Sequence, residues 1–207
     1  MSKTNISTED YNALLDFINS EIKSRGLKAT TMDSIASKYR ISKRTLYEIF
    51  ENKDQMIEAA VLHWREQASR KYSEIFASSS NIMEAILRCF IFNRDIIGKT
   101  SVSFLHDFRS FSMKKGPKSA CSDRGHLENF IKILQKGVDE GYFRNDINLQ
   151  LQCQLFHLQM ESLRHMDVVF PGDMSIVEVF DAIIITFLRG ISTPKGIDTL
   201  DKILMDL

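Results

Sequence analysis

The sequence predicts an all-α protein in two parts. Apolar residues recur at helical spacing along most of its 207 residues, and no segment shows sustained strand alternation between hairpin signals. The three prolines, Pro117, Pro171 and Pro194, each lie beside a glycine or a turn, so they separate helices instead of interrupting them. We expect an N-terminal helix-turn-helix domain of three helices over residues 1–53 and a larger helical bundle over residues 54–207.

Four helices are expected before residue 80. The first has apolar side chains on one face and ends at Gly26. The next three each follow a residue whose side chain can accept a hydrogen bond from a free backbone N–H: Thr30 or Thr31 for the second, Ser42 for the third and Asn52 for the fourth. The expected ranges are 8–25, 31–39, 43–50 and 52–77.

Six further helices are expected after residue 80, over about 80–98, 101–113, 119–140, 148–169, 174–190 and 196–206. Gly141, Gly172 and Gly190 occupy the expected helix C-termini. Residues 113–125, rich in lysine, serine and glycine, are expected to form a mobile loop. The helix over 174–190 is apolar on more than one face, so it can serve both a core and a partner chain.

The charge distribution is informative although the net charge is not. The chain has 27 basic and 27 acidic residues, and this balance alone argues against a nucleic-acid binder. From Lys23 to Lys53, however, eight basic residues face three acidic ones, an excess of five positive charges. A local basic face of this kind suits DNA even in a neutral protein.

The cysteines and the apolar runs indicate the compartment. Cys89, Cys121 and Cys153 are odd in number and form no CxxC pair, which fits a reducing environment without disulfides. The N-terminus has no apolar signal core. No apolar run approaches the roughly eighteen residues that span a bilayer. We therefore expect a cytoplasmic protein without a membrane partner.

Residues 30–53 carry the clearest functional pattern. Two short helices joined by a tight turn would bring their apolar residues into a miniature core. The outer face of the second helix is then free for short polar, cationic and phenolic side chains, which suit phosphates and base edges in a major groove. The core positions are Met32, Ile35, Ala36, Tyr39, Ile41, Leu46, Ile49 and Phe50, and the outer positions are Ser42, Lys43, Arg44, Thr45, Tyr47 and Glu48.

Over roughly residues 10–60 the sequence resembles the DNA-binding domain of the TetR family of repressors. The total length and the segment Glu140–Asp146 before a late helix are also similar to the family. The matching residues, in the family's order and spacing, are the threonine that opens the second helix, Ile35-Ala36, Ile41-Ser42, Thr45-Leu46-Tyr47, Phe50 and Lys53.

The resemblance implies a DNA-binding head and a C-terminal domain for dimerisation and small-ligand binding, in which the ligand usually releases the DNA. By position, Tyr47 and Lys53 match frequent phosphate contacts of the family, and Lys43, Arg44 and Thr45 match its recognition-helix residues. The expected DNA-binding residues are Thr30, Thr31, Arg40, Ser42, Lys43, Arg44, Thr45, Tyr47 and Lys53.

Arg40 departs from the family pattern, because the family usually has glycine at this place in the turn. Glycine tolerates a left-handed backbone, which costs another L-residue about 1 kcal/mol or a little more. Either Arg40 adopts that conformation at this cost, or the turn differs. Its charge then offers a contact to a phosphate.

A ligand site is expected in the C-terminal part. Phe104, Phe108 and Phe111 recur at i, i+4 and i+7 on one helix, and they are either core residues or an aromatic wall to a pocket. With His157 and Met160 of a later helix they would suit a small, largely apolar effector.

Neither a metal nor a catalytic site is expected. Cys153, His157, Glu161 and His165 are possible ligands that repeat every four residues, but one straight helix cannot surround an ion with four of them. The sequence has no Gly-rich phosphate loop, GxSxG or HExxH motif. We therefore expect a homodimeric repressor that is not an enzyme and needs no cofactor. The alternatives are a ligand-binding or scaffold protein with a vestigial head and, less favoured, a helical-bundle enzyme.

Overall fold

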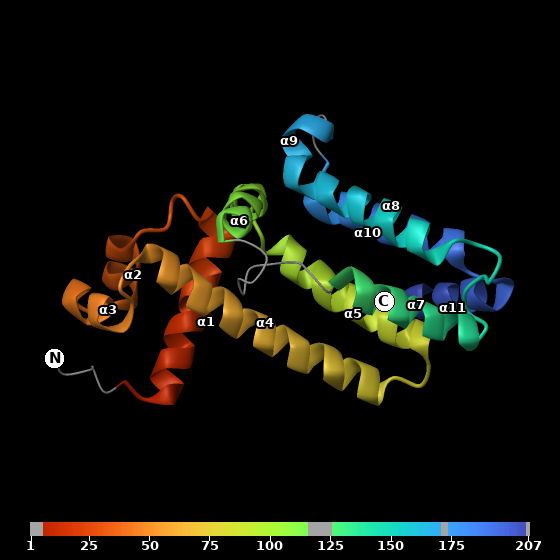
Figure 1. Cartoon of the computed structure of the whole chain (residues 1–207), viewed down its shortest axis with the longest axis horizontal. Helices are drawn as coiled ribbons and strands as arrows, with labels where there is room; N and C mark the ends of the chain where they lie inside the picture. The colour runs from red at the N-terminus through yellow and green to blue at the C-terminus, as the bar shows by residue number, and fades with distance from the viewer. Residues whose placement is uncertain (1–5, 116–125, 171–173, 206–207) are drawn as a thin grey trace. The chain divides into compact units, whose positions relative to one another are not determined.

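The computed structural model describes residues 6–115, 126–170 and 174–205, and over these residues the fold is all-α (Figure 1). The only β pairing among them is one isolated bridge. The predicted fold class is confirmed. The helices are α1 (Thr8–Arg25), α2 (Met32–Tyr39), α3 (Lys43–Ile49), α4 (Lys53–Ser78), α5 (Ile82–Gly98), α6 (Val102–Lys115), α7 (His126–Asp139), α8 (Leu149–Ser162), α9 (Met166–Val169), α10 (Ile176–Ile191) and α11 (Pro194–Met205).

The expected helix ranges agree with these bounds to within a few residues at most ends. One exception is the single helix expected over 148–169, which is instead α8, a 3₁₀ turn at Leu163–His165 and α9. That turn contains neither proline nor glycine, so the break had no signal in the sequence. The expected loop over 113–125 is helical up to Lys115, and its remainder lies outside the described residues, as does the first part of the helix expected over 119–140.

The chain divides into two compact units. The first comprises Met1–Arg70 and Lys99–Ser122, and the second comprises Lys71–Gly98 and Asp123–Leu207. The boundary that we expected at residue 53 therefore falls inside the first unit. The physical reason is that the first turns of α4 and one face of α6 contribute side chains to the same core as α1, α2 and α3.

The core of the first unit has fully buried side chains from each of its first three helices. Ile18 of α1, Ile35 of α2 and Leu46 of α3 are all inaccessible to solvent. The side-chain amide of the buried Asn19 donates a 2.7 Å hydrogen bond to the carbonyl of Ala60, which fixes α1 against α4. These contacts hold the two short helices, which are too short to be stable alone in water.

In the second unit, the segment Glu140–Asp146 lies against the end of α10. Phe143 and Ser192 form the isolated bridge, and the ring of Phe143 is buried. A Cβ atom on Gly137 would lie 2.2 Å from that ring, so only glycine fits at this position of α7. This segment, which resembles the TetR pattern, is thus a packing element of the second unit.

No helix within the described ranges combines the length and the apolar character that a membrane crossing requires.

Candidate nucleic-acid interface

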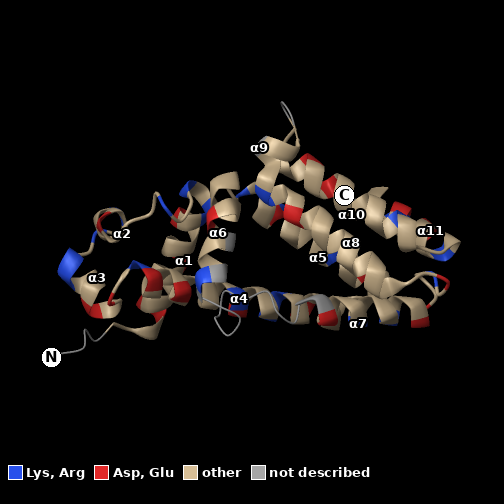
Figure 2. Cartoon of the chain, turned by 45° about the horizontal axis from the view of Figure 1, so that its top comes forward, with Lys and Arg blue, Asp and Glu red and all other residues tan. Residues whose placement is uncertain are grey.

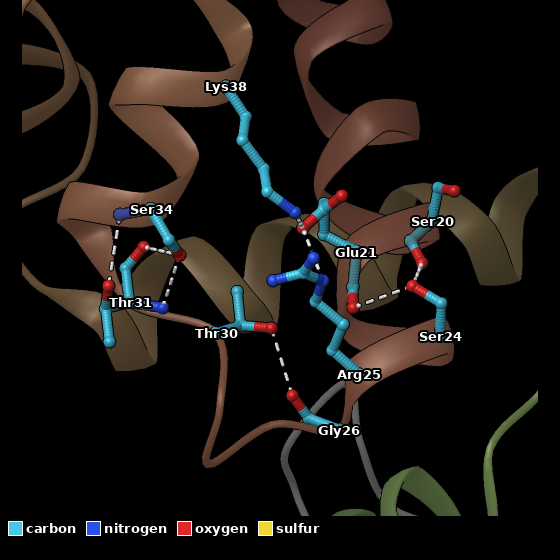
Figure 3. Close-up of polar contacts among 9 residues, drawn as sticks. All are labelled: Ser20, Glu21, Ser24, Arg25, Gly26, Thr30, Thr31, Ser34 and Lys38. Carbon is cyan, nitrogen blue, oxygen red and sulfur yellow. Dashed lines mark hydrogen bonds and ion pairs between the residues drawn. The ribbon is translucent and has the colours of Figure 1, made fainter.

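The first helix of the predicted pair, α2, is opened by a reciprocal capping box. The Oγ1 atom of Thr31 accepts a 3.1 Å hydrogen bond from the N–H of Ser34, and the Oγ atom of Ser34 accepts one of 3.0 Å from the N–H of Thr31 (Figure 3). Thr31 is exposed. Its side chain therefore marks an accessible helix N-terminus, where backbone N–H groups favour anions.

Thr30 does not belong to this accessible surface. Its side chain is buried, and its hydroxyl donates a 3.0 Å hydrogen bond to the carbonyl of Gly26, which closes the loop after α1 (Figure 3). The hydroxyl of Thr30, which was expected to contact DNA, is thus engaged inside the protein, whereas Thr31 faces solvent.

The turn between α2 and α3 is left-handed at Arg40, with φ 59° and ψ 39°. Arg40 is the one non-glycine residue with positive φ in the described part of the chain. Its N–H donates to the carbonyl of Ser37, and the N–H of Ile41 donates to the carbonyl of Ala36, which is the Schellman pattern of a helix end. Arg40 thus adopts the conformation that glycine would, at a cost of roughly 1 kcal/mol or more.

The third helix, α3, is anchored on one side and free on the other. Ser42 caps it, with its Oγ accepting a 3.0 Å hydrogen bond from the N–H of Thr45. The buried Leu46 fixes the inner face to the core. On the outer face Lys43 is exposed, and Tyr47 retains 52% of its accessible area. The predicted presentation of α3 is confirmed: its polar and phenolic side chains face solvent.

The cations of α3 are paired with carboxylates in the free protein. The Nζ atom of Lys43 lies 2.6 Å from a carboxylate oxygen of Asp33 on α2, and the Nε atom of Arg44 lies 2.9 Å from that of Glu48. Basic and acidic positions accordingly alternate over the first unit instead of forming one basic block (Figure 2). Exposed pairs like these are worth about 0–1 kcal/mol, so DNA phosphates can displace the carboxylates.

Two further lysines are held by neighbouring elements. The Nζ atom of Lys53, at the start of α4, donates a 3.3 Å hydrogen bond to the carbonyl of Lys28. Lys38 of α2 pairs with Glu21 of α1, which also lies 3.6 Å from Arg25 (Figure 3). These contacts hold α2 against α1 and the start of α4 against the loop between α1 and α2.

The loop before α2 is also tied to α6. A carboxylate oxygen of the buried Asp107 accepts a 3.1 Å hydrogen bond from the N–H of Lys28, and the other lies 3.1 Å from the Nζ of Lys28. Burial raises the pKa of Asp107, but the hydrogen bonds and charge of Lys28 outweigh it, so this pKa lies below its ordinary value. Asp107 is therefore a charged tether between α6 and the loop that leads into the helix pair.

The residues expected to bind a ligand lie in different units. Phe104 and Phe108 of α6 stack at a centroid distance of 5.3 Å and belong to the buried core of the first unit, against which Phe111 also packs. His157 and Met160 lie on α8 in the second unit, His157 exposed and Met160 partly buried. Of the two interpretations of the phenylalanine row, the structure places Phe104 and Phe108 among core side chains.

The second unit contains an aromatic cluster that the sequence analysis missed. Phe156 of α8 lies 4.4 Å from Phe187 of α10 and 5.3 Å from Phe130 of α7, measured between ring centroids. Phe130 and Phe156 are partly buried. The three rings come from three helices, so no spacing within one segment could reveal the cluster.

The repeat of Cys153, His157, Glu161 and His165, which runs from α8 into the 3₁₀ turn, does not form a ligand set. Cys153 is buried while His157 is exposed. Over the described ranges, no group of three or more histidine, cysteine or acidic side chains is arranged to hold a metal ion.

Comparisons with known proteins point to one family of regulators. Residues 14–60 match the bacterial regulatory proteins of the tetR family. The chain is 25% identical over 142 residues to the HTH-type transcriptional repressor KstR2 of Mycobacterium tuberculosis, covering 67% of this chain and 71% of that protein.

Two solved structures are similar in fold. The ketosteroid transcriptional regulator KstR2 of Mycobacterium tuberculosis aligns with a TM-score of 0.64 and 20% identity, over 93% of this chain and 100% of that one. The fatty acid degradation regulator FadR of Bacillus halodurans aligns with a TM-score of 0.64 and 14% identity, over 89% of this chain and 97% of that one.

Proposed function

We propose that the chain is a transcriptional regulator of the TetR family, and that it represses transcription by placing α3 in the major groove of operator DNA until a small, largely apolar ligand releases it. The observation that carries the proposal is the α2–turn–α3 unit, whose buried face fixes α3 while its polar face is open to solvent. Residues 14–60, which match the family, contain this whole unit.

We assign the contacts by position on the helix pair. Thr31, at the exposed N-terminus of α2, and Ser42, at that of α3, are placed to bind phosphates together with the helix N–H groups. Tyr47 and Lys53 add phosphate contacts. Lys43, Arg44 and Thr45 lie in the first turn of α3 and are assigned to base edges, with the carboxylates of Asp33 and Glu48 exchanged for DNA on binding.

We propose that the protein acts as a homodimer. One head contacts too few base pairs for useful specificity, whereas two heads about 34–36 Å apart would meet successive major grooves. Leu151, Leu155 and Leu158 recur at i, i+4 and i+7 on α8, and each exposes about half or more of its side chain. This apolar stripe, with the apolar α10, is the proposed seam between two copies. A dimer of this kind would act on DNA in the cytoplasm.

We propose a lipophilic effector. KstR2 is named as a ketosteroid regulator and FadR as a fatty acid degradation regulator, and both names refer to lipophilic compounds. In this chain the partly buried Phe130 and Phe156, together with Met160 one turn further along α8, supply an apolar surface in the second unit. The alternative position for the ligand site is beside the row of Phe104, Phe108 and Phe111 on α6.

The effector acts only through the difference between its affinities for the DNA-bound and the released conformations. In the first unit, the Asp107–Lys28 tether connects α6 to the loop before α2. A shift of α6 would therefore change the position of α2 and α3 and lower DNA affinity.

The test is selection of duplexes from a randomised library with the full-length protein, followed by mobility-shift titration of the enriched sequence. We expect an inverted-repeat sequence to bind at least a thousandfold tighter than an unrelated duplex, and lipophilic compounds to release it. Failure to enrich any sequence would overturn the proposal and favour the ligand-binding or scaffold alternative.

A further inference from the structure

The basic residues of the first unit differ in whether they already have a partner. Between Lys23 and Lys53 there are eight lysines and arginines. The ammonium of Lys23 lies 4.1 Å from the centroid of the Trp64 ring, and six others pair with a carboxylate or a backbone carbonyl. The seven partnered residues are Lys23, Arg25, Lys28, Lys38, Lys43, Arg44 and Lys53.

Arg40 is the exception. Its side chain is exposed, and among the described residues its guanidinium takes part in no hydrogen bond or ion pair. The hydrogen bonds that close the turn use the backbone alone, from the N–H groups of Arg40 and Ile41. The side chain thus forms none of the hydrogen bonds that close the strained turn, where a residue without a Cβ would be favoured.

We propose that Arg40 is a DNA-backbone contact that this chain has in place of the small turn residue, an inference that rests on the proposed function. Arg40 stands two residues before Ser42, the cap of α3. When the N-terminal end of a recognition helix enters the major groove, the chain just before it lies at the rim of that groove, beside the phosphates. A guanidinium there matches a phosphate in two parallel hydrogen bonds.

The pairing pattern gives Arg40 a particular weight in DNA binding. Lys43 and Arg44 must leave Asp33 and Glu48 before they contact DNA, whereas Arg40 leaves no internal partner. Its phosphate contact releases a counterion at no expense to the fold. The left-handed turn then costs the fold some stability, and the residue that causes this cost contributes to DNA binding instead.

The experiment measures how DNA affinity depends on salt for two variants with different backbone preferences. Arg40→Asn removes the charge but tolerates the left-handed conformation, and Arg40→Lys keeps the charge at the same backbone cost. Dissociation constants are measured over a series of KCl concentrations, with the duplex enriched by the wild-type protein and with calf-thymus DNA. Lys202→Asn, which removes an exposed charge of α11 in the second unit, is the matched control.

We expect Arg40→Asn to reduce the slope of log affinity against log salt by about 1 per protomer, equally on both DNAs. Its thermal unfolding midpoint should be no lower than that of the wild type. Arg40→Lys and Lys202→Asn should retain the wild-type slope. Arg40→Gly, which relieves the turn further, should give the same loss of slope as Arg40→Asn.

A folded Arg40→Asn protein with the wild-type slope on both DNAs would overturn the inference while leaving the proposed function intact. A change confined to the enriched sequence would also overturn it, because it would indicate a base contact. If the wild-type protein binds neither DNA, the proposed function itself fails and the inference fails with it.

Discussion

The two helices α3 and α8 both expose a row of side chains, but the rows have opposite chemistry. α3 exposes a cation and a phenol at Lys43 and Tyr47, and its charges are paired but easily released. α8 exposes three leucines at helical spacing, Leu151, Leu155 and Leu158. A polar row attracts a charged partner through interactions that salt screens, whereas an apolar row gains by being removed from water. We therefore expect two interfaces, a salt-dependent one with DNA and a salt-insensitive one with a second copy of the chain.

The largest expected effect is at the apolar row. Leu158→Asp places a charge on the most exposed of the three leucines of α8, and burying it at a dimer seam costs several kcal/mol. We expect light scattering to show a monomer and operator affinity to fall by at least a hundredfold. Met205→Asp, at an exposed apolar residue of α11, should remain dimeric. If the Leu158→Asp protein is dimeric, the dimer interface does not include this face of α8.

The next effect separates the two positions proposed for the ligand. Phe108 is buried in the core of the first unit, so Phe108→Ala should lower the free energy of unfolding by about 3–5 kcal/mol. Phe156 is partly buried, so Phe156→Ala should lower the free energy of unfolding by less than Phe108→Ala does. It should also weaken the binding of the effector, as measured by calorimetry. A stable Phe108→Ala protein with weakened effector binding would restore the α6 row as the pocket wall.

The α3 segment and the aromatic cluster of the second unit also differ in how far the sequence predicted them. Around α3, the caps, the turn and the exposed face lie within one short segment, so local spacing indicates the turn around Arg40 and the cap at Ser42. Thr30 and Thr31 are equally good caps of α2 by sequence, and only the packed loop shows that Thr31 is the cap and that the hydroxyl of Thr30 bonds inside the protein. The aromatic cluster of Phe130, Phe156 and Phe187 depends on the packing of three helices, which no local pattern specifies.

The polar row can itself be divided into residues that read sequence and residues that bind any DNA. Thr45→Ala, in the first turn of α3, should reduce the preference for the enriched sequence by roughly 1–3 kcal/mol while leaving calf-thymus binding unchanged. Lys53→Ala should weaken both DNAs alike and reduce the salt slope by about 1 per protomer. Equal effects of the two substitutions on both DNAs would contradict the assignment of Thr45 to a base edge.

The smallest expected effect is at Asp33, whose carboxylate competes with DNA for the ammonium of Lys43. Asp33 pairs with Lys43 at 2.6 Å, and both side chains are more than half exposed. Asp33→Asn should therefore change the free energy of unfolding by less than about 1 kcal/mol.

The same substitution should strengthen DNA binding, because it frees Lys43 and removes a negative charge close to the proposed phosphate contacts. We expect affinity to rise by roughly two- to fivefold at moderate salt, a difference below about 1 kcal/mol, and the gain to shrink as salt screens the charge. Glu128→Gln, at an exposed acid of α7 in the second unit, removes the same charge and should leave affinity unchanged. If Asp33→Asn weakens DNA binding, the Asp33–Lys43 pair orients the lysine for the groove instead of withholding it, and α3 would then be preorganised by its ion pairs.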